Sequence, residues 1–334
     1  MMERINTIWN QLERNTSTVA GLFKQRYSDT SACDVFLGLK YPENFRMLVL
    51  KTPVLIGKEF NFKYQFRGLK FEKVYDPDDS DSLLLNLVLV DRNFTDIFDS
   101  LITDVVGSII DENEIKTILK TYTNRLVKWQ SLFERLNQEG LSVEQQRGLF
   151  GELFFLRKFI KNNTDLMNVV DSWIGPENQV RDFQSGTWSV EVKTTSGNNH
   201  QKLQISSERQ LDKKNLEHLF LFHLSLDTRL QSGETLNQIV DDVGEFLSMD
   251  FPAVNCFREK LIRAGYLTHH RHLYDTTGYF VRDESTFEVM DDFPRIEEID
   301  VRSGVGDVKY SIVVSNYQRF LVSDEFVFKN VNFI

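Results

Sequence analysis

Cysteine is scarce in this sequence: Cys33 and Cys256 are its two cysteines, and neither has a Cys-x-x-Cys partner. A disulfide framework needs several cysteines and a structural zinc site needs clustered ligands, so we expect neither. His269, His270 and His272 stand close together without further spaced ligands. We therefore interpret these histidines as a polar surface, with contact to phosphate as an open alternative, rather than as a zinc site.

Long apolar runs are also lacking. The longest run, Leu83 to Val90, is interrupted by Asn86 and is far too short to cross a bilayer. The first residues include an acidic Glu3 and no apolar h-region of a signal peptide. We expect a soluble, cytoplasmic protein with no membrane partner.

The 334-residue chain has fewer basic than acidic residues, 39 Lys and Arg against 49 Asp and Glu, and therefore a net charge of -10 at pH 7. This balance argues against a protein that coats nucleic acid nonspecifically, because such proteins carry a broad basic surface. It leaves a nuclease possible, whose metal site adds carboxylates and whose basic groove can be local. No G-x-G-x-x-G motif, phosphate loop or nucleophile elbow supports a metabolic enzyme on another α/β fold.

The first part of the chain predicts a β-rich region followed by helices. Residues 2–15 have apolar side chains at the spacing of one helical face. Between 33 and 90, short β-prone runs alternate with turn sequences such as the Asp-Pro-Asp-Asp at 76–79, which predicts four or five antiparallel strands. Residues 93–110 and 112–136 predict helices that bridge to the second half.

Basic and aromatic side chains are frequent in this β-rich region, which has two explanations. We favour a solvated strand face, and contact with a nucleic-acid backbone is the alternative. The residues concerned are Lys58, Lys63, Tyr64, Arg67, Lys70 and Lys73.

The second part alternates predicted helices and strands. A helix is expected over 143–161 with a cap at Ser142, and Glu152 lies among its apolar residues. Val169 to Trp173 predicts a core strand, and Trp173 with Pro176 is interpreted as a structural corner. Downstream, the pattern predicts a strand at 202–206, a short helix or turn at 207–211, an apolar interior strand at 218–226, helices at 236–249 and 253–264, and a β-rich segment from 271 on.

A hairpin is predicted in the middle of this part. Val180 to Phe183 and Thr187 to Thr195 are β-prone, and the three residues between them form a turn. Strand alternation places Glu191 and Lys193 on the same face. Such charges on a mostly apolar strand indicate a face that opens onto water, a metal or a ligand.

A second carboxylate, Asp182, is expected beside Glu191 across the hairpin. Two adjacent carboxylates repel each other, and a hard divalent cation relieves the repulsion. Oxygen ligands of this type suit Mg2+ or Mn2+. Lys193 would then act near a bound water or phosphate.

The pattern of Asp182 followed by Glu191-Val192-Lys193, with Glu152 on an upstream helix, resembles the PD-(D/E)XK nuclease superfamily. More narrowly, the runs GELFFL, WIGP, RDF, VEVKTTS and ISSERQL resemble a prokaryotic family assigned to that superfamily and linked to phage defence. A lone Glu-x-Lys is uninformative, whereas the full constellation is much rarer. Arg181 replaces the proline of the superfamily name, but only the carboxylate is chemically required. The resemblance is strongest over residues 148–226.

The resemblance implies an α/β (α+β) fold with a restriction-endonuclease-like core, in which a central mixed sheet is flanked by helices. We place this core and a β-rich extension at 139–334, and the N-terminal β-rich region and helical bridge at 1–138. The implied metal ligands are Asp182, Glu191, the carbonyl of Val192 and Glu152. Lys193 would orient or activate water, and Gln210 would lie at the edge of the site. Without the resemblance, the alternatives are an exposed helix residue for Glu152 and a surface glutamine for Gln210.

The function implied is a Mg2+-dependent or Mn2+-dependent DNA endonuclease, in a prokaryotic restriction or phage-defence system. Other defence-system proteins are potential partners, and a homodimer remains open. The alternative is a catalytically inactive member of the same fold that binds DNA or assembles a defence complex, because a fold does not fix an activity.

Overall fold

The structure is a computed structural model that describes residues 2–14, 21–28, 33–63, 65–135, 139–177, 179–197, 201–290 and 292–333. It divides into two compact units, Met1–Leu136 and Asn137–Ile334. Tyr64, one of the candidate surface residues, lies outside the described residues. None of the described helices is long and apolar enough to cross a membrane.

The first unit is built on a five-stranded antiparallel sheet with the strand order β1-β2-β3-β5-β4. This confirms the predicted β-rich region, although its first strand was not among the predicted runs. The helix α1 buries the apolar stripe that the sequence predicts, including Ile5 and Trp9. The elements are α1 (Met2–Arg14), β1 (Gly21–Ser28), β2 (Asp34–Tyr41), β3 (Phe45–Pro53), α2 (Val54–Glu59), β4 (Leu69–Asp76), β5 (Asp79–Leu89), α3 (Thr95–Ile109) and α4 (Ile115–Arg135).

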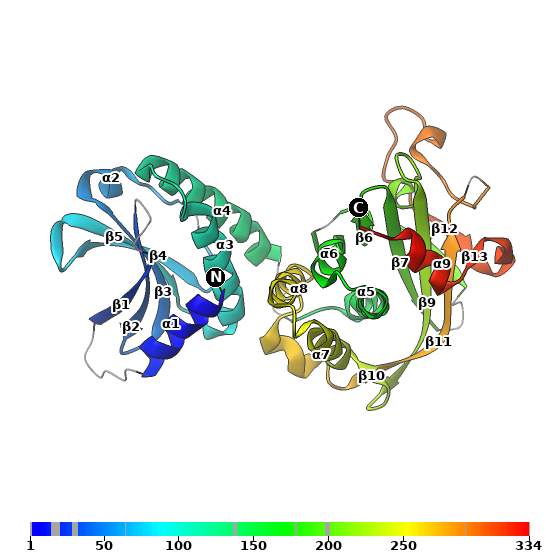
Figure 1. The fold of residues 1–334 in the computed structure, drawn as a ribbon, viewed down its shortest axis with the longest axis horizontal. Helices are drawn as coiled ribbons and strands as arrows, with labels where there is room; N and C mark the ends of the chain where they lie inside the picture. The colour runs from blue at the N-terminus through cyan, green and yellow to red at the C-terminus, as the bar shows by residue number, and fades with distance from the viewer. Residues whose placement is uncertain are drawn as a thin grey trace. The chain divides into compact units, whose positions relative to one another are not determined.

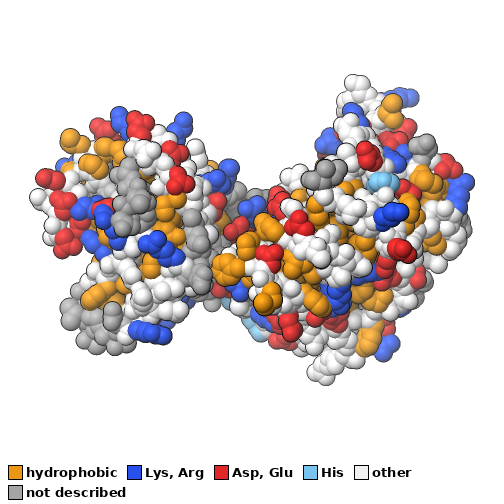
Figure 2. All heavy atoms as spheres, viewed as in Figure 1, with side chains coloured by type: hydrophobic (Ala, Val, Ile, Leu, Met, Phe, Trp, Pro, Cys, Tyr) orange, Lys and Arg blue, Asp and Glu red, His pale blue; other side chains and the backbone are white. Residues whose placement is uncertain are grey.

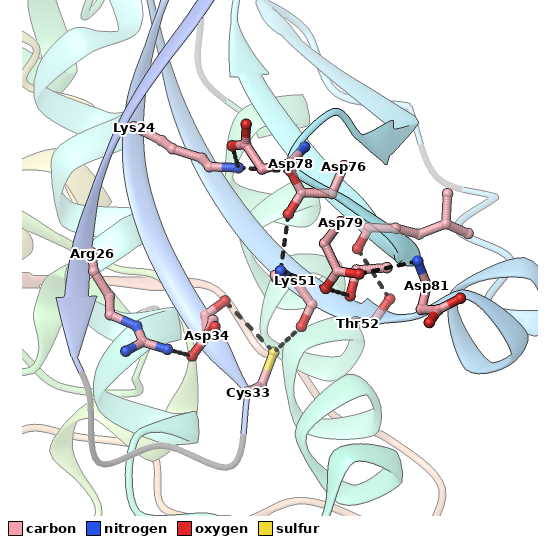
Figure 3. A network of polar contacts seen from close by, with 12 residues as sticks. Lys24, Arg26, Cys33, Asp34, Lys51, Thr52, Asp76, Asp78, Asp79 and Asp81 are labelled. Atoms are coloured by element: carbon pink, nitrogen blue, oxygen red, sulfur yellow. Dashed lines mark hydrogen bonds and ion pairs between the residues drawn. The ribbon is translucent and has the colours of Figure 1, made fainter.

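A network of charged side chains joins the strands of this sheet (Figure 3). The side chain of Asp76, only 1% exposed, pairs with Lys24 at 2.9 Å and with Lys51 at 3.1 Å. Lys51 also pairs with Asp79 at 2.8 Å, so both ends of the predicted turn at 76–79 are held by lysines of other strands. A buried carboxylate needs such partners because its desolvation is costly.

The basic candidates on and around β4 make contacts within their own unit. Lys70 pairs with Glu72 at 2.9 Å, and Lys73 donates a hydrogen bond to the carbonyl of Gly57 at 3.1 Å. Lys58 lies over the ring of Tyr75. These contacts agree with the interpretation as a strand face.

The second unit contains a mixed sheet with the order β10-β11-β9-β7-β6, with β13 added beside β11. β7 and β9 are parallel, and the other pairs are antiparallel. Figure 1 shows α5, α6, α7 and α8 gathered on one side of this sheet. The expected α+β fold, a mixed sheet flanked by helices, is therefore confirmed.

The strands of the second unit are β6 (Phe183–Ser185), β7 (Trp188–Ser196), β8 (Lys202–Ile205), β9 (His218–Leu230), β10 (Glu234–Thr235), β11 (Thr277–Glu288), β12 (Tyr310–Val313) and β13 (Leu321–Val322). The helices are α5 (Val143–Lys161), α6 (Leu166–Asp171), α7 (Leu236–Leu247), α8 (Phe251–Arg263) and α9 (Asp324–Asn330).

The two faces of this sheet bury two separate cores. Val190 and Val192 of β7 belong to the core that contains α5, α7 and α8. The other face packs Leu219 and Leu221 of β9 against the small β8–β12 sheet. Because side chains alternate along a strand, the residues between the valines of β7 point to this second face.

Several predicted elements are wrong or displaced. Val169 to Trp173 is not a strand: α6 runs to Asp171 and begins at an N-cap where the side chain of Asp165 accepts a hydrogen bond from the backbone N–H of Asn168. Both valines of α6 are buried, so tertiary packing overrides their β propensity. The hairpin begins later than predicted, at β6, and turns at residues 186–187.

Two further differences lie between residues 268 and 330. Residues 324–330 form α9 rather than a strand, because Ser323 caps the helix and Asp324 and Glu325 occupy its first turn. The histidines at 269, 270 and 272 lie in a 3-10 helix, Thr268–Leu273, in which His270 is buried. The side chain of His270 is therefore not part of a polar surface.

Candidate active site

Strand β7 brings Glu191 and Lys193 to the same face of the sheet. The Nζ of Lys193 lies 2.7 Å from Oε1 of Glu191. The Glu191 side chain is 1% exposed and that of Lys193 is 17% exposed, so solvent reaches the pair through the lysine. The predicted alternation is correct, and Val190 and Val192 on either side of Glu191 are buried in the opposite core.

Asp182 lies immediately before β6, at the edge of the sheet, rather than within a strand as expected. Phe183 pairs with Val190 in the hairpin, so the next position outward places Asp182 beside Glu191. The carboxylate of Asp182 accepts a hydrogen bond from the backbone N–H of Val192 at 2.7 Å. This bond fixes the aspartate against the strand that carries the other two charged residues.

Glu152 comes from helix α5. That helix begins with the predicted cap, in which Ser142 and Gln145 exchange side-chain to backbone hydrogen bonds. Oε2 of Glu152 accepts a hydrogen bond from the indole N–H of Trp173 at 2.7 Å. Trp173 is thus more than the structural corner predicted for it.

Gly175 lies between the carboxylates of Glu152 and Asp182. A Cβ at this position would meet Oε2 of Glu152 at 2.8 Å and Oδ1 of Asp182 at 3.0 Å. Both oxygens therefore face one small space, which a side chain at residue 175 would fill. The structure thus brings all three predicted carboxylates into one neighbourhood.

The proximity of these carboxylates changes their acidity. Burial and the negative charge of Asp182 raise the pKa of Glu191 to about 8, although the ammonium of Lys193 acts to lower it. Burial and the charge of Asp182 also raise the pKa of Glu152 well above its usual range. For Asp182 itself burial raises the pKa, opposed by Lys193 and by the N–H of Val192. Burial acts to lower the pKa of Lys193, but Glu191 and Asp182 outweigh it and raise that pKa.

Gln210 reaches the site from the short 3-10 helix Glu208–Leu211. Its Oε1 accepts hydrogen bonds from Nζ of Lys193 at 3.1 Å and from the backbone N–H of Ser206 at 2.8 Å. The family resemblance implies a position at the edge of the site for this residue, with a surface glutamine as the alternative, and in the structure its side chain contacts the lysine.

Arg181 occupies the position of the superfamily's proline and holds that 3-10 helix. Its guanidinium donates to the carbonyls of Gln210 at 3.1 Å and Arg209 at 3.0 Å, and also to that of Asp212. Sequence reasoning did not assign this role to Arg181. The three carbonyls lie about thirty residues away in the sequence. The available sequence signal for these contacts was the presence of an arginine, which has several hydrogen-bond donors, directly before Asp182.

The residues present fit a hard divalent cation. Oε2 of Glu191 is buried without a hydrogen-bond partner in the described structure. Carboxylate and carbonyl oxygens are the preferred ligands of Mg2+ and Mn2+. Among the described residues, no group of three or more His, Cys, Asp or Glu side chains is already arranged around an ion position. The fit therefore rests on the unpartnered oxygen, the space at Gly175 and the donor chemistry.

An acid at the sheet edge, an acid and a lysine on the next strand, and a carboxylate on the flanking helix follow the PD-(D/E)XK pattern that the sequence resembles. The model of the family described as "Putative PD-(D/E)XK family member (DUF4420)" matches residues 5–315, and the chain belongs to this family. The match includes most of the first unit, well beyond the 148–226 stretch that carried the resemblance. The comparison with curated proteins found no match, and neither did the comparison with solved structures.

Proposed function

We propose that this chain is a metal-dependent DNA endonuclease that hydrolyses phosphodiester bonds. The observation that supports it most directly is the grouping of Asp182, Glu191 and Lys193, in which one carboxylate oxygen is buried without a partner. Burying the carboxylates of Asp182 and Glu191 beside each other costs free energy, and a bound cation would offset this cost. Family membership supports nuclease chemistry independently.

In this proposal Asp182, Glu191, the carbonyl of Val192 and Glu152 hold Mg2+ or Mn2+. A divalent cation in this class of site polarises the scissile phosphate and lowers the pKa of water. The four protein groups supply oxygen donors from three different elements, the edge before β6, strand β7 and helix α5.

Lys193 contributes positive charge. The raised pKa keeps its ammonium protonated at neutral pH, so it donates hydrogen bonds and offsets charge that develops on phosphate oxygens, rather than accepting a proton. Glu191 and Gln210 hold its Nζ from two sides at 2.7 and 3.1 Å. Such fixed positioning costs no reorganisation during the reaction.

Charge on the surface agrees with local rather than general binding of DNA. On the face drawn in Figure 2, basic and acidic side chains are interspersed over each unit. With a net charge of -10, a DNA-binding groove would be restricted to part of the surface. DNA is the proposed partner, and a cytoplasmic location is part of the proposal.

Cleavage of circular DNA tests the proposal, because a circle has no ends for an exonuclease. We expect supercoiled plasmid to be nicked or linearised with Mg2+ or Mn2+ and to stay intact in EDTA. Ca2+ should support binding better than turnover, because it is larger and takes more ligands in looser geometry. Cleavage that is undiminished in EDTA would rule out the mechanism.

A role in restriction or phage defence is part of the proposal and is supported by the family resemblance alone. The competing function is an inactive DNA-binding or assembly subunit. It predicts no cleavage of DNA under any metal condition, even after natural partner proteins are added. The intact set of two acids and a lysine favours the active enzyme.

A further inference from the structure

The segment 171–177 connects Glu152 and Asp182, which lie on different elements of the site. From one end, the indole N–H of Trp173 donates to Glu152 at 2.7 Å. The backbone N–H groups of Ile174 and Gly175 both donate to the carbonyl of Asp182, at 2.8 and 2.9 Å. Three consecutive residues therefore contact Glu152 on α5 and Asp182 before β6.

The indole has little freedom to turn away from Glu152. Trp173 is completely buried, and its ring packs against that of Phe257 on α8 with centroids 6.0 Å apart. Its backbone pairs with Phe183, the first residue of β6. The N–H donor is thus held by packing on one side and by the sheet on the other.

A buried lysine outside the site anchors the same segment. Lys260 of α8 is 3% exposed, and its Nζ lies 2.7 Å from the carbonyl of Trp173, 3.0 Å from that of Asp171 and 2.9 Å from Oε1 of Glu177. An ammonium group has three donors, and each of these acceptors takes one. Lys260 therefore holds the backbone at Asp171 and Trp173 and the side chain of Glu177.

We propose that Trp173 is a positioning residue, and that the 171–177 segment, anchored by Lys260, sets the place of Glu152 relative to Asp182 for binding a divalent cation. This inference rests on the proposed metal-dependent function. Hydrogen-bond partners that orient a ligand contribute strongly to metal affinity, and losing one typically costs 10- to 100-fold. Gly175 belongs to the same device, because only the absence of a side chain leaves room for the two carboxylates.

Titration of the whole chain with Mn2+ tests this role without requiring activity. Trp173→Phe keeps an aromatic ring but removes the N–H, and should weaken Mn2+ binding about 10-fold by calorimetry. Trp188→Phe is the matched control: Trp188 is also a buried tryptophan of this unit, but its N–H donates to the carbonyl of Asn332 at 2.8 Å, away from the carboxylates. It should leave Mn2+ affinity unchanged.

A second background separates positioning from general loosening of the fold. In Glu152→Ala, the indole has no carboxylate to hold, so adding Trp173→Phe should weaken Mn2+ binding no further. An equal loss with and without Glu152 would overturn the proposal, as would unchanged affinity in the single variant Trp173→Phe.

Fluorescence gives a reading that does not require Trp173 to be replaced. The chain has four tryptophans, and paramagnetic Mn2+ quenches those nearest to it. Quenching of the wild-type chain should persist in Trp9→Phe, Trp129→Phe and Trp188→Phe. Quenching that disappears in one of these three variants would assign the signal to another tryptophan and contradict the proposal.

The two proposals can fail separately. If Mn2+ binding depends on Trp173 but the chain cuts no DNA, the positioning role is supported and the nuclease proposal is wrong. Metal-dependent cleavage with wild-type Mn2+ affinity in Trp173→Phe would retain the nuclease and reject the positioning role. A chain that binds no Mn2+ would reject both.

Discussion

The backbone N–H of Val192 donates a hydrogen bond to the carboxylate of Asp182 at 2.7 Å. Val192 stands between Glu191 and Lys193, so this bond ties the aspartate to the strand segment that presents both charged residues. Its side chain points into the opposite core, which immobilises the strand. Backbone and core contacts therefore help to set the geometry of the acidic pair, in addition to the ion pair between Glu191 and Lys193.

Asp182→Asn should weaken metal binding while leaving the fold intact. Asparagine retains an oxygen that accepts from Val192, but it removes a ligand charge, and Mn2+ affinity should fall at least about 10-fold. Above about pH 8, where Glu191 is ionised, the melting temperature in EDTA should stay equal or rise, because the substitution removes one of the two repelling charges. Calorimetry and thermal melts measure the two effects, with the exposed Asp283→Asn as control. A large loss of stability in EDTA would identify the carboxylate as structural.

Lys193→Ala should abolish most cleavage and affect metal binding less. The ammonium acts on charge that develops during the reaction, so the rate should fall about 10^2-fold or more. Its removal also leaves buried Glu191 without its cation, which favours the protonated acid and makes Mn2+ binding somewhat weaker at neutral pH. Plasmid cleavage and Mn2+ titration of Lys193→Ala should be compared with exposed Lys202→Ala. Wild-type cleavage by a folded Lys193→Ala chain would remove the residue from the mechanism.

Local patterns predicted much of the fold because they depend on neighbours in sequence. Alternation along β7 was correct for Glu191 and Lys193, and the cap at Ser142 was correct for α5. The error at Val169 and Val170 arose because two β-branched residues favour a strand locally, while burial of α6 decides for a helix.

Contacts between distant residues were beyond the sequence signal. Lys260 and Trp173 are separated by 87 residues, and nothing in a lone lysine on a helix indicates which carbonyls it will meet. The bond between Trp173 and Glu152 likewise depends on how α5 packs beside the 171–177 segment. The chemistry of the site was therefore predictable from residue types, whereas the groups that hold it in place required the structure.

Stability without metal should fall as pH rises. The pKa of Glu191 is about 8 in the folded chain, against an ordinary value of 4.5, so the folded state binds the extra proton between these values. The stabilisation is complete below about pH 4.5 and is lost as pH rises through about 8. Urea unfolding in EDTA at several pH values measures this slope. In Glu191→Gln, which cannot titrate, the slope over this range should be smaller, and an unchanged slope would show that Glu191 ionises normally.

Gly175→Ala should disturb the site although alanine is the smallest side chain. The new Cβ would lie 2.8 Å from Oε2 of Glu152, which is closer than real Cβ contacts, and 3.0 Å from Oδ1 of Asp182, which is tighter than most of them. The carboxylate of Glu152 must therefore move. Glu152 is held by Trp173 and Asp182 by Val192, hence movement breaks or stretches a hydrogen bond. We expect a loss of about 1–3 kcal/mol in the free energy of unfolding, typical of overpacking, together with weaker Mn2+ binding.

Gly148→Ala provides the matched control for this substitution. Gly148 lies inside α5, the helix that carries Glu152, and a Cβ there would meet nothing within 4 Å. Alanine in a helix interior is favoured over glycine by about 1 kcal/mol, so this variant should be more stable and bind Mn2+ normally. In urea unfolding, the free energy of unfolding should therefore fall in Gly175→Ala and rise in Gly148→Ala. In Mn2+ titration, the affinity should fall in Gly175→Ala and stay unchanged in Gly148→Ala. Equal metal affinity in Gly175→Ala and Gly148→Ala would mean that the space beside the carboxylates serves no ion.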